Sequence, residues 1–211
     1  MKPHFMIVML LFMLASCESA PAATPIHLLD FKPGMINSKL YKGKLKYGKR
    51  WKDARGENVI ILTESGVYWK DVYDATRSAK LYAYHFIRNR DSTWEEQWKM
   101  YDMVDDCAWD VRCEFFKNSL TITDLDNDGL AEVGFAYGLS CNGDSNPDEK
   151  KLIFFEGIDR YSITGTTAYF ERKKKTGTDE ITEKKFHDAP GEFTEFALQQ
   201  WNKYGVPKTA E

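Results

Sequence analysis

The chain has 211 residues and a formal net charge of −3, from 29 basic and 32 acidic side chains. A balance so close to neutral gives no electrostatic reason to expect a nucleic acid as partner. Aromatic residues make up 14% of the chain, which suits a β-rich core, and the length fits one ordinary domain.

The first residues form a targeting signal rather than part of the fold. Lys2 is followed by an apolar run from Phe5 to Leu14, which is shorter than the about 20 residues that a membrane-spanning helix needs. The run ends at Leu14-Ala15-Ser16-Cys17, which resembles the bacterial lipobox read by lipoprotein signal peptidase. This resemblance implies removal of residues 1–16 and acylation of Cys17; an ordinary signal peptide is the alternative.

We expect the lipid to hold the mature chain on a membrane of the cell envelope. Several acyl chains, at about 0.8 kcal/mol per buried methylene, make such an anchor long-lived. Glu18 stands where many enterobacterial lipoproteins retained in the inner membrane have aspartate, so we expect the outer membrane, at its periplasmic face or the cell surface. Residues 17–38 are predicted to be the lipidated cysteine and a flexible tether, because residues 18–25 are rich in small residues and proline.

A basic segment comes next. It carries seven cations and no acid, interleaved with aromatic residues: Lys39, Lys42, Lys44, Lys46, Lys49, Arg50 and Lys52. On a lipoprotein such a segment can contact anionic lipid headgroups or polysaccharide. An edge strand that lysines protect against self-association has the same composition, and we favour this interpretation.

Period-two alternation dominates residues 39–206, which we expect to form a single β-rich domain. Lys44–Lys52 and Asn58–Thr63 flank a predicted hairpin turn, and Lys80–Arg88 is apolar on both faces, as in a central strand. The remaining predicted strands are 67–69, 96–104, 120–123, 133–139, 151–156, 161–172 and 180–186, with a solvated hairpin tip at 173–177. In residues 133–139 large and small side chains alternate strictly, which indicates close packing on the small face.

One helix is predicted, near residues 191–204. Phe193, Phe196, Ala197 and Trp201 recur at helical spacing, and Gly205 ends the pattern. We expect these apolar side chains to pack on one face of the sheet. The predicted class is therefore mainly β (α+β): an antiparallel sheet or meander, of which a propeller blade is one form, with one C-terminal helix packed on it.

Three cysteines follow Cys17: Cys107, Cys113 and Cys141. An oxidising envelope permits one disulfide among them. We expect Cys107 to pair with Cys141, because each lies where a predicted strand gives way to a loop; Cys107 with Cys113 is the alternative. Cys113 is then expected to be a small buried hydrophobe rather than a reactive thiol.

The most specific motif is an acidic loop at residues 124–132, Asp-Leu-Asp-Asn-Asp-Gly-Leu-Ala-Glu. Carboxylates at alternating positions followed by a glycine are typical of calcium sites, which take six to eight oxygen ligands. The predicted ligands are the carboxylates of Asp124, Asp126, Asp128 and Glu132 and the backbone carbonyl of Leu130. We expect a structural Ca²⁺; an acidic turn whose side chains cap the backbone is the alternative.

The loop resembles the integrin-type (FG-GAP) calcium loop, which runs from strand to strand and closes with an acid at its ninth position. That family usually has aspartate where this chain has Glu132, and its propellers carry several such loops where this chain has one. An EF-hand would require flanking helices and an acid where Phe135 stands.

Longer segments resemble a family of secreted flavobacterial and related Bacteroidetes proteins, whose name links it to surface polysaccharide biosynthesis. The resemblance covers about residues 39–170 and rests on four segments: Trp51-Lys52-Asp53 with Gly56-Glu57-Asn58, residues 123–132, Ser140-Cys141, and Lys151-Leu152-Ile153 leading to residues 161–167. The family name identifies no chemistry, and only the acidic loop can be carried over.

The sequence therefore predicts a lipid-anchored envelope protein with a calcium-stabilised β-domain, acting as a binding or scaffold component. The family resemblance implies a link to surface polysaccharide, and other envelope proteins are further expected partners. A non-catalytic role is favoured, because GxSxG, HExxH and P-loop motifs are missing and His85 lies in an apolar strand. The alternative is an envelope glycan-acting enzyme, a hydrolase or an accessory of a transferase, that uses acids near Asp144 and Asp148.

Overall fold

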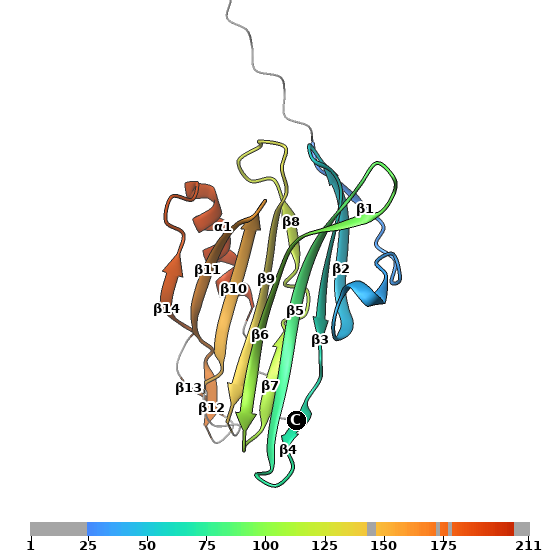
Figure 1. Cartoon of the computed structure of the whole chain (residues 1–211). Coiled ribbons are helices and arrows are strands. Elements are labelled where there is room, and N and C mark those ends of the chain that lie inside the picture. The colour runs from blue at the N-terminus through green and yellow to red at the C-terminus, as the bar shows by residue number, and fades with distance from the viewer. Residues whose placement is uncertain (1–24, 143–146, 172–173, 177–178, 205–211) are drawn as a thin grey trace, which may run out of the picture.

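The computed structural model describes residues 25–142, 147–171, 174–176 and 179–204. Most of these residues belong to antiparallel strands, and the described part of the chain contains one α-helix, at its C-terminal end (Figure 1). The expected class, mainly β with a single helix on the sheet, is confirmed. Within the same residues, no helix is long and apolar enough to span a membrane.

The first sheet has the strand order β1-β2-β3-β5-β4, and β6 also pairs with β5. Its strands are β1 (His27–Leu29), β2 (Lys44–Asp53), β3 (Gly56–Glu64), β4 (Tyr68–Asp71), β5 (Thr76–Arg88) and β6 (Trp94–Cys107). The hairpin predicted between β2 and β3 is confirmed. So is the central position of β5, which pairs with β3, β4 and β6.

The second sheet has the order β14-β11-β10-β9-β7, and β8 also pairs with β9. Its strands are β7 (Val111–Phe115), β8 (Thr121–Thr123), β9 (Glu132–Cys141), β10 (Glu149–Glu156), β11 (Asp159–Thr166) and β14 (Glu180–Lys185). The antiparallel sheet or meander predicted from the sequence is therefore divided into two main sheets, a division that the prediction did not specify. Alternation specifies which side chains share a face, but not which strands share a sheet.

The strand predicted at 161–172 is divided in the structure. After β11, the backbone N–H groups of Thr167 and Ala168 donate to the carbonyl of Asp148 and to the Asp179 carboxylate. These bonds take the chain out of the β11 ladder. It continues as β12 (Tyr169–Glu171), which pairs with β13 (Lys174–Thr176), where a solvated tip was predicted.

The main core lies between the two sheets. Large side chains of β9 enter it at every second position, and they meet apolar residues of both sheets: Val133, Phe135, Tyr137 and Leu139 with Trp51, Ile60, Leu62, Leu81, Phe115, Ile153 and Phe155. The small residues of β9 occupy its other face. A Cβ on Gly134 would lie 2.6 Å from Oγ1 of Thr121, and one on Gly138 would lie 3.1 Å from the Phe116 ring. The close packing predicted for that face is confirmed.

The outer face of the second sheet is covered by α1 (Gly191–Lys203). Phe193, Ala197 and Trp201 of this helix are buried in one cluster with Phe154 and other residues of the sheet, as predicted from their spacing. Phe196 is partly buried at the margin of the same cluster.

The outer face of the first sheet is covered by residues 31–41, which include a short 3₁₀ helix, η1 (Ser38–Leu40). Ile36 is buried there, and Phe31 packs beside it. The flexible tether expected to reach residue 38 is therefore too long: the fold begins at β1, whose apolar residues are too few to stand out as a strand pattern.

The basic segment is only in part the edge strand that was expected. β1 pairs with Arg50, Lys52 and the residue between them, so that only the C-terminal part of β2 is covered. Before Arg50, β2 has no partner strand on that side among the described residues. Two of its cations bind carboxylates of β3, because Lys46 lies 2.9 Å from Glu64 and Arg50 lies 2.9 Å from Glu57.

Candidate metal centre at the acidic loop

The acidic loop connects β8 to β9, and these strands pair with each other from Thr123 opposite Glu132 onwards. Asn127 and Gly129 have positive φ angles of 59° and 83°, which a glycine adopts without strain and an asparagine tolerates. The loop is thus a tight turn between two antiparallel strands.

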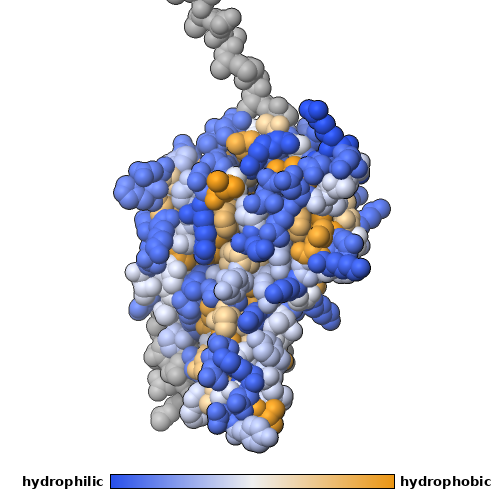
Figure 2. Space-filling view, viewed as in Figure 1, coloured by the Kyte–Doolittle hydropathy of each residue, from blue (hydrophilic) through white to orange (hydrophobic). Residues whose placement is uncertain are grey.

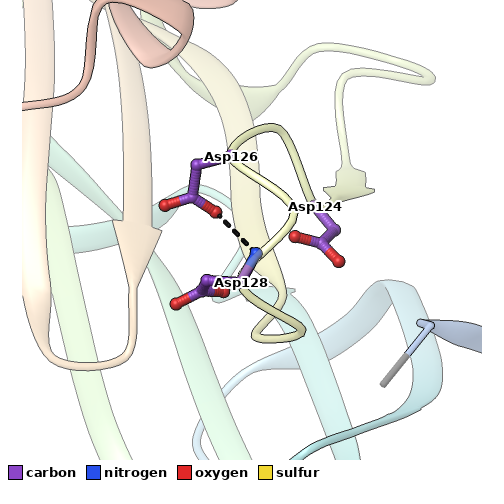
Figure 3. Close-up of side chains that lie close together, drawn as sticks. All are labelled: Asp124, Asp126 and Asp128. Carbon is purple, nitrogen blue, oxygen red and sulfur yellow. Dashed lines mark hydrogen bonds between the residues drawn. The ribbon is translucent and has the colours of Figure 1, made fainter. Parts of the chain in front are cut away.

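Backbone N–H groups inside the loop hold the three aspartates in place. The N–H of Asp128 donates to Asp126 Oδ1 over 3.2 Å, that of Gly129 to Asp124 Oδ1 over 3.4 Å, and that of Leu130 to Asp128 Oδ1 over 2.7 Å. The loop therefore curls around its own carboxylates, and oxygen atoms of the three aspartates come within 4.8 Å of one another (Figure 3).

Glu132 belongs to a second group of acids. Its carboxylate is buried and accepts the backbone N–H of Leu125 on both oxygens, at 3.0 and 3.1 Å. One of its oxygens lies within 4.8 Å of oxygens from Asp126 and Glu156. Asp126 is shared by both groups, so the two acid sets adjoin.

Glu156 lies outside the loop motif that the sequence predicts as the metal site. It stands at the end of β10, 24 positions after Glu132, and becomes its neighbour only because β9 and β10 pair in the register that places Glu156 opposite Glu132. The sequence contains no local signal of this register, because Glu156 ends an apolar strand and surface acids often stand at such positions.

The environment of Glu132 and Glu156 disfavours the charged forms of these two carboxyl groups. Burial raises the pKa of Glu132 to about 7. Burial also raises the pKa of Glu156, and the charges of Asp126, Asp128 and Asp159 raise it further. One oxygen of Glu156, Oε1, is buried and has no hydrogen-bond partner among the described residues. A hard divalent cation suits this donor set, because calcium is bound by carboxylate oxygens and offsets their mutual repulsion.

The first sheet reaches this cluster through the turn between β2 and β3. The N–H of Ala54 donates to the carbonyl of Gly129 over 2.9 Å. The buried Asp53 carboxylate accepts the indole N–H of Trp51 at 2.9 Å, and at 3.4 Å the backbone N–H of Ala131. Both sheets are therefore fastened to the acidic loop.

Comparison with protein-family models, curated proteins and solved structures found no match.

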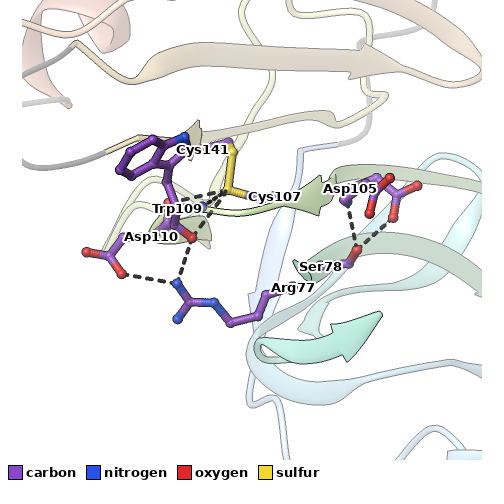
Figure 4. Close-up of a disulfide and its surroundings, with 8 residues drawn as sticks. Arg77, Ser78, Asp105, Cys107, Trp109, Asp110 and Cys141 are labelled. Atoms are coloured by element: carbon purple, nitrogen blue, oxygen red, sulfur yellow. Dashed lines mark hydrogen bonds and ion pairs between the residues drawn. A yellow bond between two sulfur atoms is a disulfide. The ribbon is translucent and has the colours of Figure 1, made fainter. Parts of the chain in front are cut away.

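Cys107 and Cys141 form a disulfide that joins the end of β6 to the end of β9 (Figure 4). Cys113 is a free, half-buried thiol, and burial raises its pKa to about 12. Since the thiolate is the nucleophile, this thiol is unreactive at neutral pH.

Of the remaining candidates, His85 and Asp148 are buried and bound to neighbouring side chains. His85 is buried between Trp51 and Trp98, its Nε2 lies 2.9 Å from Asn58 Oδ1, and burial lowers its pKa to about 3. Asp148 is buried and forms an ion pair with Arg112. Cys17 and Asp144 lie outside the described residues.

Proposed function

We propose that the chain is a lipid-anchored protein of the cell envelope whose β-domain is stabilised by calcium and serves as a binding or scaffold component for surface polysaccharide. The acid cluster carries the calcium part of this proposal. It combines two adjoining carboxylate groups with a buried glutamate oxygen that has no hydrogen-bond partner among the described residues.

The residues that would hold the ion are Asp124, Asp126 and Asp128, with Glu132 and Glu156 adjoining and Leu130 offering its carbonyl. Bound calcium supplies positive charge that lets these carboxylates stay ionised at close range. Since Glu156 belongs to β10 and the loop contacts Ala54 of the first sheet, the ion would hold together three separate turns of the domain. Its role is structural.

Thermal unfolding with calcium and with a chelator tests this role. An ion at about a hundredfold excess over its Kd adds about 3 kcal/mol of stability, or about 5 to 10 °C in Tm for a domain of this size. Asp126→Asn removes the acid that both groups share and should abolish the response. Asp74→Asn, an exposed acid far from the loop, should leave it intact. An equal Tm in calcium and in chelator would overturn the metal site.

The lipid anchor is tested separately. In a bacterial host with lipoprotein processing, labelled palmitate should be incorporated into the protein and should be lost with Cys17→Ser. The same change should move the protein from the detergent-rich to the aqueous phase in detergent partitioning. Unlabelled protein in the aqueous phase would show that the signal is an ordinary one.

A further inference from the structure

Exposed aromatic and apolar side chains gather at the end of the domain opposite the acidic loop. They lie on β4, directly before and after it, and in the turn after β6: Val67, Tyr68, Trp69, Val72, Tyr73 and Trp109. We call this set the aromatic tip. Trp69 is 61% exposed, Trp109 69% and Tyr73 99%, whereas large aromatic side chains without a partner are usually buried. Concentrated exposure of this kind marks a binding surface.

The tip faces away from the start of the fold. β1 pairs beside the β2–β3 turn, which contacts the acidic loop, so both lie at one end of the sheets. β4 pairs with the opposite end of β5, and the two ends are far apart in Figure 1. A lipid attached before β1 would therefore hold the tip away from the membrane.

Arg77 links two residues at the centre of the tip. Trp69, Arg77 and Cys107 are direct cross-strand partners, in this order, on β4, β5 and β6, so their side chains share a face of the sheet. The Arg77 guanidinium lies 5.9 Å from the centre of the Trp69 ring and donates to the carbonyl of Trp109 over 2.7 Å. The disulfide fixes the β6 turn from the other side (Figure 4). A preformed surface of this kind binds without a large ordering cost.

The charge of the tip restricts what it can bind. Residues 67–77 and 105–110 contain five acids, Asp71, Asp74, Asp105, Asp106 and Asp110, against two cations, Lys70 and Arg77. Both cations are already paired, Lys70 with Asp105 at 2.5 Å and Arg77 with Asp110 at 3.3 Å. Figure 2 shows strongly hydrophilic residues beside apolar ones at this lower end. The excess negative charge repels phosphate, sulfate and uronate groups, and therefore anionic lipid and acidic polysaccharide.

We infer that the aromatic tip binds an uncharged glycan chain. The face of an aromatic ring carries the negative part of its quadrupole, so it attracts the polarised C–H groups on the flat side of a sugar ring. Exposed carboxylates beside the rings accept hydrogen bonds from hydroxyl groups. This inference rests on the polysaccharide role proposed above. It adds that the ligand is neutral and that it binds at Trp69, Tyr73 and Trp109.

The test uses the full chain purified in detergent. Binding is measured by biolayer interferometry to immobilised neutral polysaccharides, a β-glucan and a mannan, and to acidic alginate. Trp69→Ala and Trp109→Ala remove one ring each at exposed positions. Tyr101→Ala is the matched control, because Tyr101 is 65% exposed on β6 but stands beside Tyr82, away from the tip. Unchanged Tm values show that each variant is folded.

We expect the unsubstituted chain to bind a neutral polysaccharide. Each tryptophan variant should lose about tenfold or more in affinity, and the affinity of Tyr101→Ala should change by less than about twofold. Glycan binding that the tryptophan variants leave intact, or a preference for alginate, would overturn the site while the polysaccharide role stands. Binding to none of the three would overturn both. A monomer–dimer equilibrium that the tryptophan variants abolish, without glycan binding, would assign the tip to a second copy of the chain.

Discussion

Glu132 on β9 and Glu156 on β10 are direct cross-strand partners at one end of two central strands of the second sheet, and their carboxylates adjoin Asp126 of the acidic loop. Like charges placed directly opposite each other destabilise a sheet unless something compensates them. The pair therefore couples strand register to the occupancy of the proposed calcium site.

This coupling predicts that Glu156→Gln raises the Tm in chelator and reduces the rise in Tm that calcium causes. In chelator the variant should unfold at a higher temperature than the unsubstituted chain, because one of the repelling carboxylates is gone. Calcium should raise the Tm of the variant by fewer degrees than that of the unsubstituted chain, because one anionic ligand is lost. Differential scanning calorimetry in both conditions measures the two Tm values. A variant that is less stable in chelator, with an unchanged calcium increment, would contradict the assignment of Glu156.

His85 makes stability depend on pH on the acidic side of neutrality. The folded-state pKa is about 3 and the unfolded-state pKa is about 6.5, so the unfolded chain binds the proton first as pH falls. The stability that the neutral His85 contributes is complete above about pH 6.5. It is lost as pH falls towards 3, at up to about 1.4 kcal/mol per pH unit.

The measurement for His85 is urea unfolding of the unsubstituted chain and of His85→Gln between pH 7 and pH 4. Other titrating groups are common to both proteins, so the difference in their free energies isolates the histidine. As pH falls, the free energy of unfolding of the unsubstituted chain should decrease relative to that of the variant. A difference that is constant across this range would show that His85 can be protonated in the folded state.

Lys150 is a buried cation under the helix. Its side chain is fully buried, forms an ion pair with Asp179, donates to the carbonyl of Trp201 over 2.6 Å and lies 4.3 Å from the centre of the Trp201 ring. Lys150→Ala leaves the carboxylate and carbonyl without this partner and creates a cavity, which should cost about 3 kcal/mol or more. Lys184→Ala, on an exposed position of β14, should change the free energy of unfolding by about 0.5 kcal/mol or less. Chemical denaturation of both variants compares the two positions.

The Cys107–Cys141 bond closes a long loop, with a sequence separation of 34. In the chain-entropy description a loop of this length contributes about 3 to 4 kcal/mol by restricting the unfolded state. The double variant Cys107→Ser, Cys141→Ser should lose stability of that order, and a reducing agent should lower the Tm of the unsubstituted chain but not that of the variant. Cys113→Ser serves as the control, because Cys113 is a free thiol. Equal stability of the double variant and the control would contradict a native bond.

Local patterns were sufficient for most of the elements. Alternation along the chain predicted β3 and β9, because side chains of a strand face opposite sides with a period of two. A segment that is apolar on both faces predicted the central strand β5. The spacing of Phe193, Ala197 and Trp201 predicted the helix and the face that it buries. The alternation of large and small residues in β9 predicted close packing on one side, where Phe116 and Thr121 now lie.

The sequence by itself determined the local features: where strands and the helix form, that residues 124–132 are an acidic turn, and that a lipobox-like segment precedes the domain. Each of these depends on neighbours along the chain. Only the tertiary structure decided that the strands divide into two sheets, that β1 belongs to the fold, that Glu156 joins the acid cluster and that Arg77 gathers Trp69 and Trp109 at one end. These relationships depend on strand register and on contacts between distant segments, which the period of the side chains does not specify.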